Sequence, residues 1–271
     1  PEKYSKVKIF AGNGSDIKKI NDSGLFFDHA EVIAGEYIET WLSESEIKML
    51  NKSGVSYQIT IDDWMRYYNN LPKMTAQEIS DAIQNSIDEY NVSHSIYGSM
   101  GGYLIFSEVV NKLDSMRIEY PNLISEKFSI GNSVENRAMW TVRVSNSPNA
   151  PTGRPEVWFH ALIHAREPMS MEQSLYFMYW LMENYNIDPI ATYILRNREL
   201  YFTPVFNPDG YEYNRSTDPT GGGMWRKNRK LNSGTTYGID LNRNFGTYAF
   251  WNSTNNGSST VPSSDTYRGL S

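Results

Sequence analysis

Cysteine is absent from the sequence of 271 residues. This absence excludes disulfide bonds, thiol nucleophiles and zinc sites with cysteine ligands. Histidine is scarce, with only four residues, so any transition-metal site must combine a few imidazoles with carboxylates. No apolar run approaches the roughly 20 residues that cross a bilayer. The formal net charge is −6 rather than positive, which argues against general binding of nucleic acid.

Residues 1–70 alternate short β-type segments with helical ones. The elements that we expect are, in order, a strand at 7–11, a helix at 16–21, strands at 30–34 and 37–42, a helix at 43–52 and a strand at 55–61. Ser43 and Glu46 form a capping-box pattern at the start of the second helix, and Gly54 suits its C-cap. The order βαββαβ predicts a small two-layer α+β sandwich.

A polar, partly helical stretch at 71–95 follows this first domain. The acidic, amphipathic pattern at 75–87 is typical of a solvated helix on a domain surface. A cleavable activation segment is the alternative interpretation. We therefore treat 71–95 as a connector.

Longer elements alternate from residue 96 onward. We expect helices at 104–116 and 169–184, strands at 124–130, 138–144, 156–163 and 199–206, and loops at 221–223 and 252–264. Connections of this length suit crossovers, so the pattern predicts an α/β domain with a mixed or parallel sheet over 96–271.

His164 and Glu167 lie three residues apart, where the strand at 156–163 gives way to a helix that begins near Pro168. A tight turn can present an imidazole and a carboxylate to one metal ion. Taken alone, His-x-x-Glu is a weak pattern, and ordinary surface polarity is the more common explanation.

Three later segments carry further polar and charged side chains that could act together with this turn. The segment 207–211, Asn-Pro-Asp-Gly-Tyr, is typical of a well-formed loop. The segment 225–229, Trp-Arg-Lys-Asn-Arg, suits either a solvated basic face or an oxyanion site. The segment 240–245, Asp-Leu-Asn-Arg-Asn-Phe, can present a guanidinium beside an amide to a carboxylate ligand, although structural hydrogen bonding is the simpler interpretation.

Together the four segments, in this order, resemble the motifs of the zinc metallocarboxypeptidase family of the carboxypeptidase A/B type. The resemblance implies a carboxypeptidase-like α/β catalytic domain over 96–271, incomplete at its C-terminal side. Residues 1–70 are similar to the ferredoxin-like prodomain that inhibits some members of the family before activation. The implied function is a zymogen that hydrolyses C-terminal peptide bonds with metal-activated water.

The resemblance implies a role for each matching residue. His164 and Glu167 would be ligands of one Zn²⁺ ion, and the carboxypeptidase A site is a His₂Glu site. Asp240 would accept a hydrogen bond from His164 and fix the orientation of its ring. Arg226 would polarise the scissile carbonyl and stabilise the oxyanion.

Substrate binding is implied for three further residues. Asn242 and Arg243 would bind the free C-terminal carboxylate of a peptide or protein substrate, which makes the class an exopeptidase. Arg166 would line the neighbouring subsite. The implied partners are thus peptide C-termini and the intramolecular prodomain, with no nucleic acid and no membrane span, and we expect secretion or export to the periplasm.

The resemblance also implies residues that follow Ser271. The third zinc ligand would be a His after the segment 267–269, and the general-base Glu would come later still. His160 does not replace that His, because four residues of a strand span roughly 13 Å. We do not expect His29 or His94 to do so either. The 271 residues by themselves are therefore expected to bind zinc weakly and to lack activity.

Two other functions stay open at the level of sequence. One is a carboxypeptidase-like binding or adhesion domain without catalysis. The other is a related zinc enzyme that trims cell-wall peptides or removes acyl groups. The Asn242-Arg243 pair favours a substrate with a free carboxylate but excludes neither.

Overall fold

The computed structural model describes residues 2–27, 29–252 and 257–269. Part of the predicted loop at 252–264 and the predicted end at Ser271 lie outside the described residues. The chain divides into two compact units, and each is considered by itself below. Unit 1 comprises Pro1–Leu71 and Met224–Ser271, and unit 2 comprises Pro72–Gly223. Among the described helices, none is long and apolar enough to cross a membrane.

Unit 1 contains a four-stranded antiparallel sheet with strand order β2-β3-β1-β4. Its first elements are β1 (Tyr4–Ile9), α1 (Gly14–Asp22), β2 (Glu31–Ile33), β3 (Tyr37–Ser43), α2 (Glu44–Ser53) and β4 (Tyr57–Ile61). The predicted order βαββαβ is confirmed. The strand order is that of a ferredoxin-like sheet, because the two strands nearest the centre are β1 and β3.

Local sequence signals account for the second helix of unit 1. The Ser43 hydroxyl accepts a hydrogen bond from the backbone N–H of Glu46, whose carboxylate in turn accepts one from the Ser43 N–H. Gly54 ends the helix in the left-handed region, with φ of +69°. The sheet and helices bury a small core that includes Val7, Ile20 and Leu50.

The remaining elements of unit 1 were not predicted from the sequence. Helix α3 (Trp64–Asn69) begins at the Asp63 cap, and Trp64 meets Trp41 edge to face with ring centroids 4.7 Å apart. The segment from Met224 onward is mostly irregular, with a 3-10 turn η1 (Leu241–Arg243) and a short helix α9 (Tyr248–Trp251). It joins the N-terminal sheet through a hydrogen bond from the Tyr4 hydroxyl to Asp265.

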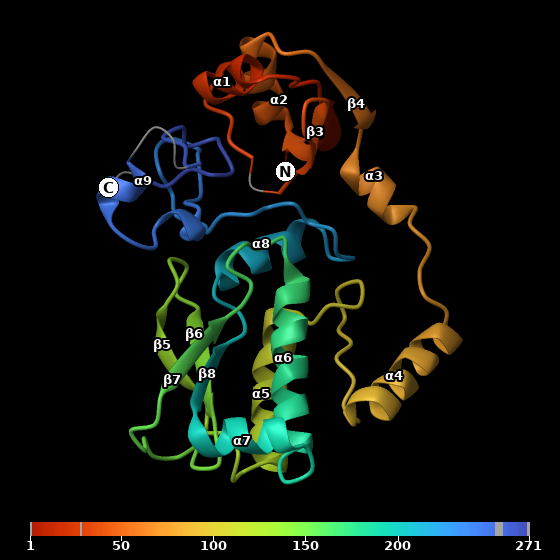
Figure 1. Cartoon of the computed structure of the whole chain (residues 1–271), viewed down its shortest axis with the longest axis vertical. Coiled ribbons are helices and arrows are strands. Elements are labelled where there is room, and N and C mark those ends of the chain that lie inside the picture. Colours follow the sequence, from red (N-terminus) through yellow and green to blue (C-terminus); the bar gives the residue numbers. More distant parts are fainter. Residues whose placement is uncertain (1, 28, 253–256, 270–271) are drawn as a thin grey trace. The chain divides into compact units, whose positions relative to one another are not determined.

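Unit 2 contains a mixed sheet with strand order β5-β6-β8-β7. Its elements are α4 (Ala76–Tyr90), α5 (Phe106–Glu119), β5 (Phe128–Asn132), β6 (Ala138–Val144), β7 (Glu156–His160), α6 (Pro168–Glu183), α7 (Pro189–Asn197), β8 (Glu199–Thr203) and α8 (Pro208–Thr217). Strands β7 and β8 are parallel, whereas β5, β6 and β8 pair antiparallel. The expected mixed α/β architecture is confirmed, with α5 and α6 beside the sheet (Figure 1).

Several local predictions in unit 2 need correction. The strands predicted at 156–163 and 199–206 end earlier, at His160 and Thr203. Strand β5 begins at Phe128 rather than at 124, because Ile124 forms only an isolated bridge with Val144. Helix α7 was missed, although Asp188 caps it and Pro189 occupies its first turn. The predicted loop at 207–211 is the start of helix α8.

Candidate active site

The His164–Glu167 turn lies between the end of β7 and the start of α6. The Glu167 backbone N–H donates to the His164 carbonyl over 3.1 Å, which closes the turn. Glu167 is also the N-cap residue of α6, and Pro168 holds the first helical position. The predicted strand-to-helix turn is thereby confirmed.

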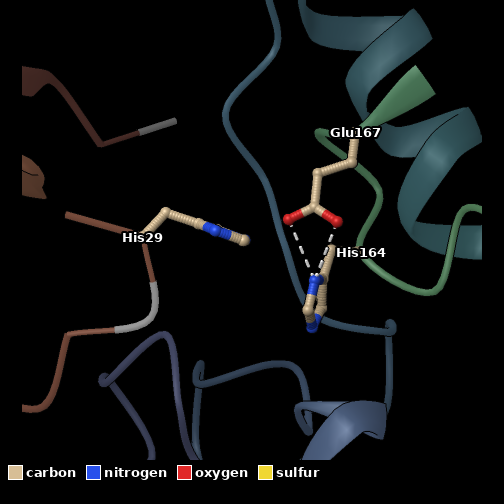
Figure 2. Close-up of side chains that lie close together, drawn as sticks. All are labelled: His29, His164 and Glu167. Carbon is tan, nitrogen blue, oxygen red and sulfur yellow. Dashed lines mark hydrogen bonds and ion pairs between the residues drawn. The ribbon is translucent and has the colours of Figure 1, made fainter. Parts of the chain in front are cut away.

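The side chains of this turn converge on one point (Figure 2). Nδ1 of His164 lies 3.0 Å from each of the two carboxylate oxygens of Glu167. His164 is buried, with 3% of its surface exposed, whereas the Glu167 side chain is one-third exposed. Imidazole and carboxylate are the donor types that zinc accepts when cysteine is absent, so this donor set fits zinc. His29, also drawn in Figure 2, belongs to unit 1.

Helix α8 positions this turn through two asparagine side chains. The Asn207 amide donates to the carbonyl of Ile163 over 3.2 Å, and the Asn214 amide donates to the carbonyl of Ala165 over 3.0 Å. These two carbonyls flank His164 in the sequence. Leu162 just before them has a φ of +53°, a conformation that costs free energy in a residue with a branched side chain.

The role of these asparagines was missed at the level of sequence. Asn207 was assigned to a loop, although Asn followed by Pro is also a helix-start signal. In the structure Asn207 caps α8 by accepting the N–H of Gly210. Asn214 lies on α8, so no local pattern would have pointed to it.

Asp209, in the same segment, is buried and anchors the β5–β6 hairpin. Its carboxylate accepts hydrogen bonds from the Ser133 hydroxyl, the Glu135 backbone N–H and the Arg137 guanidinium, all within 2.9 Å. A carboxylate with this many donors is a structural group, and nothing in its surroundings suggests a reactive role.

Unit 1 holds the other predicted site residues, grouped around Asp240. Nε and Nη2 of Arg226 donate to Oδ2 of Asp240 over 3.1 and 2.9 Å, and both side chains are fully buried. The Asn242 backbone N–H donates to Oδ1 of Asp240 over 2.9 Å, because Asp240 caps the turn η1. Asp240 therefore organises the whole motif.

Arg243 is buried beside this pair. Its Nε donates to the carbonyl of Gly257 over 3.0 Å, and its Nη1 donates to the carbonyl of Asn242 over 3.0 Å. Nη1 also lies 3.9 Å from Oδ2 of Asp240. Two guanidinium groups thus approach the one carboxylate of Asp240.

The structure brings the predicted residues together in two sets. His164, Glu167 and the half-buried Arg166 share the turn in unit 2. The second set lies in unit 1 and comprises Arg226, Asp240, Asn242 and Arg243. The expected hydrogen bond between Asp240 and His164 stays a prediction, because it would join the two units.

The other two histidines of unit 2, His94 and His160, contact carboxylates and aromatic rings respectively. His94 lies between carboxylates, with Nε2 3.0 Å from Glu119 and Nδ1 2.8 Å from Glu183, and its ring stacks on Tyr179. His160 lies near the rings of Trp158 and Phe206, and burial lowers its pKa.

Residues 109–271, well over half of the chain, match a family model described as zinc carboxypeptidase. The chain belongs to the zinc carboxypeptidase family. Two curated relatives are mouse carboxypeptidase A2, which is 31% identical over 223 residues and 82% of this chain, and mouse carboxypeptidase A4, which is 28% identical over 97% of it.

A solved carboxypeptidase A from Helicoverpa armigera has the same fold. It superposes on the whole of this chain with a TM-score of 0.71 at 22% sequence identity. The 271 residues span about half the length of the curated relatives, covering 48% of carboxypeptidase A2 and 60% of carboxypeptidase A4. The family name specifies zinc, and the donor types of the His164–Glu167 turn agree with it.

Proposed function

We propose that the chain is the precursor of a zinc-dependent carboxypeptidase, which removes residues from the C-termini of peptides and proteins. One observation carries the proposal: Nδ1 of His164 lies 3.0 Å from each carboxylate oxygen of Glu167. Hydrogen bonds to the carbonyls before and after His164 hold this turn in place. A family match supports it independently.

His164 and Glu167 would hold the metal in this proposal, and their turn is preorganised by Asn207 and Asn214. Zinc, when bound, would supply Lewis-acid chemistry and lower the pKa of a water molecule. Preorganisation matters because side chains that become ordered only when the metal binds lower the affinity for the metal.

The cationic residues of unit 1 would recognise the substrate in this proposal. Arg243 with Asn242 would bind the terminal carboxylate, because a planar guanidinium pairs with a carboxylate through two parallel hydrogen bonds. Arg226 would stabilise the developing oxyanion, and its bond to Asp240 would hold the guanidinium in place. Arg166 would contact the neighbouring substrate residue.

Hydrolysis of blocked dipeptides tests the reaction type. A substrate with a free C-terminal carboxylate should be cleaved, and the same dipeptide with a C-terminal amide should not. This cleavage is expected of the protein with any coding sequence that follows the 271 residues, and the 271 residues alone serve as the inactive comparison. Equal cleavage of acid and amide would contradict the exopeptidase proposal.

Zinc affinity tests the ligand set separately from turnover. Two protein ligands hold zinc poorly compared with the three of catalytic zinc sites, so we propose that the 271 residues alone bind less than one equivalent and lack activity. Metal analysis after dialysis measures the stoichiometry. Robust turnover by these residues alone would disprove the need for a further ligand.

Residues 1–70 are proposed to act as an inhibitory prodomain, with release by cleavage in the connector. Lys73 supports this proposal, because it is exposed in a stretch without regular structure just before α4. Limited trypsin digestion of the active protein should cut near Lys73 and raise its activity. Unchanged activity after complete cleavage, or an equal rise on trypsin treatment of the Lys73→Gln variant without cleavage at this position, would count against a prodomain.

Secretion or export to the periplasm completes the proposal. Fractionation of the cells that make the protein, followed by immunoblotting, tests it. Recovery only from the cytosolic fraction would contradict it.

A further inference from the structure

A cavity of about 450 Å³ lies within unit 2, and neither His164 nor Glu167 is among the residues that line it. Residues of helix α4, of the segment 92–97 and of helix α6 form its walls. Both helices are labelled in Figure 1. The walls are mostly apolar, with Met74, Ile79, Ile83, Ile96 and Tyr176 among them. Its size falls within the roughly 300–1,000 Å³ of typical small-molecule sites.

Glu172 lines this cavity from α6 and is more than nine-tenths buried, with 8% of its surface exposed. Its Oε1 accepts the backbone N–H of Leu104 over 2.8 Å. Its Oε2 is buried and has no hydrogen-bond partner among the described residues. A buried carboxylate oxygen without a donor costs free energy, so its presence calls for an explanation.

Hydrogen bonds through Leu104 hold one oxygen of the Glu172 carboxylate in place. The Tyr211 hydroxyl donates to the carbonyl of Leu104 over 2.6 Å, while the N–H of the same residue holds Oε1 of Glu172. One end of the carboxylate is therefore anchored to a peptide group that is itself hydrogen-bonded, and Oε2 is the end that lacks a hydrogen-bond donor among the described residues.

The charged neighbours of Glu172 do not neutralise it. Lys112 and Glu108 on α5 act on it in opposite directions. The other titratable groups nearby are Tyr211 of α8 and the lining residues His94, Tyr97 and Tyr176. No ion pair reaches Glu172 within the part of the chain that the structure describes. Burial raises the pKa of Glu172 to about 7.

We propose that this cavity binds a small primary amine, with its apolar body against α4 and α6 and its ammonium group on Oε2 of Glu172. An ammonium group supplies both the hydrogen-bond donor and the positive charge that the buried carboxylate lacks. The apolar walls would bury the hydrocarbon part. None of the predicted zinc or substrate residues lines this cavity.

Calorimetric titration of the full chain with phenethylamine tests the proposal, with 2-phenylethanol as a neutral probe of the same shape. Phenethylamine should bind at least tenfold more tightly than the alcohol at pH 8. Its affinity should fall several-fold as the pH is lowered from 8 to 6, because Glu172 gains a proton over this range. Equal affinity for amine and alcohol would overturn the proposal.

Two variants locate the binding. Glu172→Gln keeps an acceptor for the Leu104 N–H but removes the charge, so amine affinity should fall at least tenfold while alcohol binding is unchanged. Ala82→Phe fills a lining position on α4 and should weaken both probes, whereas Gln84→Phe, on the same helix but outside the lining, should weaken neither. Amine binding unaffected by either Glu172→Gln or Ala82→Phe would place the ligand elsewhere and refute the site.

Discussion

Both Nε and Nη2 of Arg226 donate to the same carboxylate oxygen, Oδ2, of Asp240, and neither side chain is exposed to solvent. The two residues are 14 positions apart in an irregular part of unit 1. Because the ion pair is buried, loss of either partner leaves a charge without compensation in a medium that solvates it poorly. The pair is thus expected to hold this segment in place.

Arg226→Ala and Asp240→Ala should each destabilise the chain by about 3–5 kcal/mol, the range typical of broken buried ion pairs. Urea unfolding followed by circular dichroism measures the change. Lys18→Ala is the matched control, since the exposed Lys18–Asp22 pair on α1 contributes little, about 0.5 kcal/mol or less. Similar losses in Arg226→Ala and Lys18→Ala would contradict a structural role for the buried pair.

Asn207→Ala should destabilise the chain by about 1–2 kcal/mol, because it removes the cap of α8 and the hydrogen bond to the Ile163 carbonyl. The same unfolding measurement applies. Asn197→Ala, at the exposed end of α7, should change stability by less than about 0.5 kcal/mol. An Asn207 variant as stable as the Asn197 variant would show that α8 does not need its cap.

Glu172→Gln should alter how stability depends on pH. The pKa of Glu172 is about 7 in the folded chain against 4.5 ordinarily, so the folded state binds the proton more tightly. Its contribution to stability is present below pH 4.5 and is lost as the pH rises through about 7. Relative to the wild type, Glu172→Gln should therefore gain on the order of 3 kcal/mol between pH 4 and pH 8.

Urea unfolding of both proteins across this pH range measures that difference. Glu199→Gln is a useful comparison, because donors such as Thr152 lower the pKa of that buried carboxylate and the trend with pH should reverse. A free-energy difference that stays constant with pH would mean that Glu172 does not titrate abnormally.

His164→Ala and Glu167→Gln should each reduce the residual zinc affinity of the chain at least tenfold. The first variant removes the imidazole ligand and the second removes the negative charge that the metal requires. Competition with a fluorescent zinc chelator measures the affinity. His160→Ala is the control, since His160 ends β7 four positions before His164. An equal loss in this variant would point to a different ligand set.

Local rules predicted the first domain well. The capping box of Ser43 and Glu46 and the left-handed Gly54 set both ends of α2, and alternation marked the strands around it. In unit 2 the apolar run at 138–144 predicted both ends of β6 correctly. A buried strand continues only as far as its side chains suit the core. The domain boundaries predicted at 70 and 95 stay predictions.

The error at 207–211 arose because the same residues can form either a loop or the start of a helix. Asn-Pro and Asp-Gly suit both a loop and a helix start, and the sequence alone does not separate them. The side chain of Asn207 decides the matter by capping α8 while also reaching the Ile163 carbonyl across the chain.

The spacing of His164 and Glu167 at a strand-to-helix turn was determined by the sequence itself, because three residues are enough to place both groups on one turn. The ion pair of Arg226 with Asp240, the cavity and the unpartnered oxygen of Glu172 were decided only by the tertiary structure. Burial and pairing of charges depend on segments far apart in the chain, and the cost of a buried charge cannot be assigned until those segments meet.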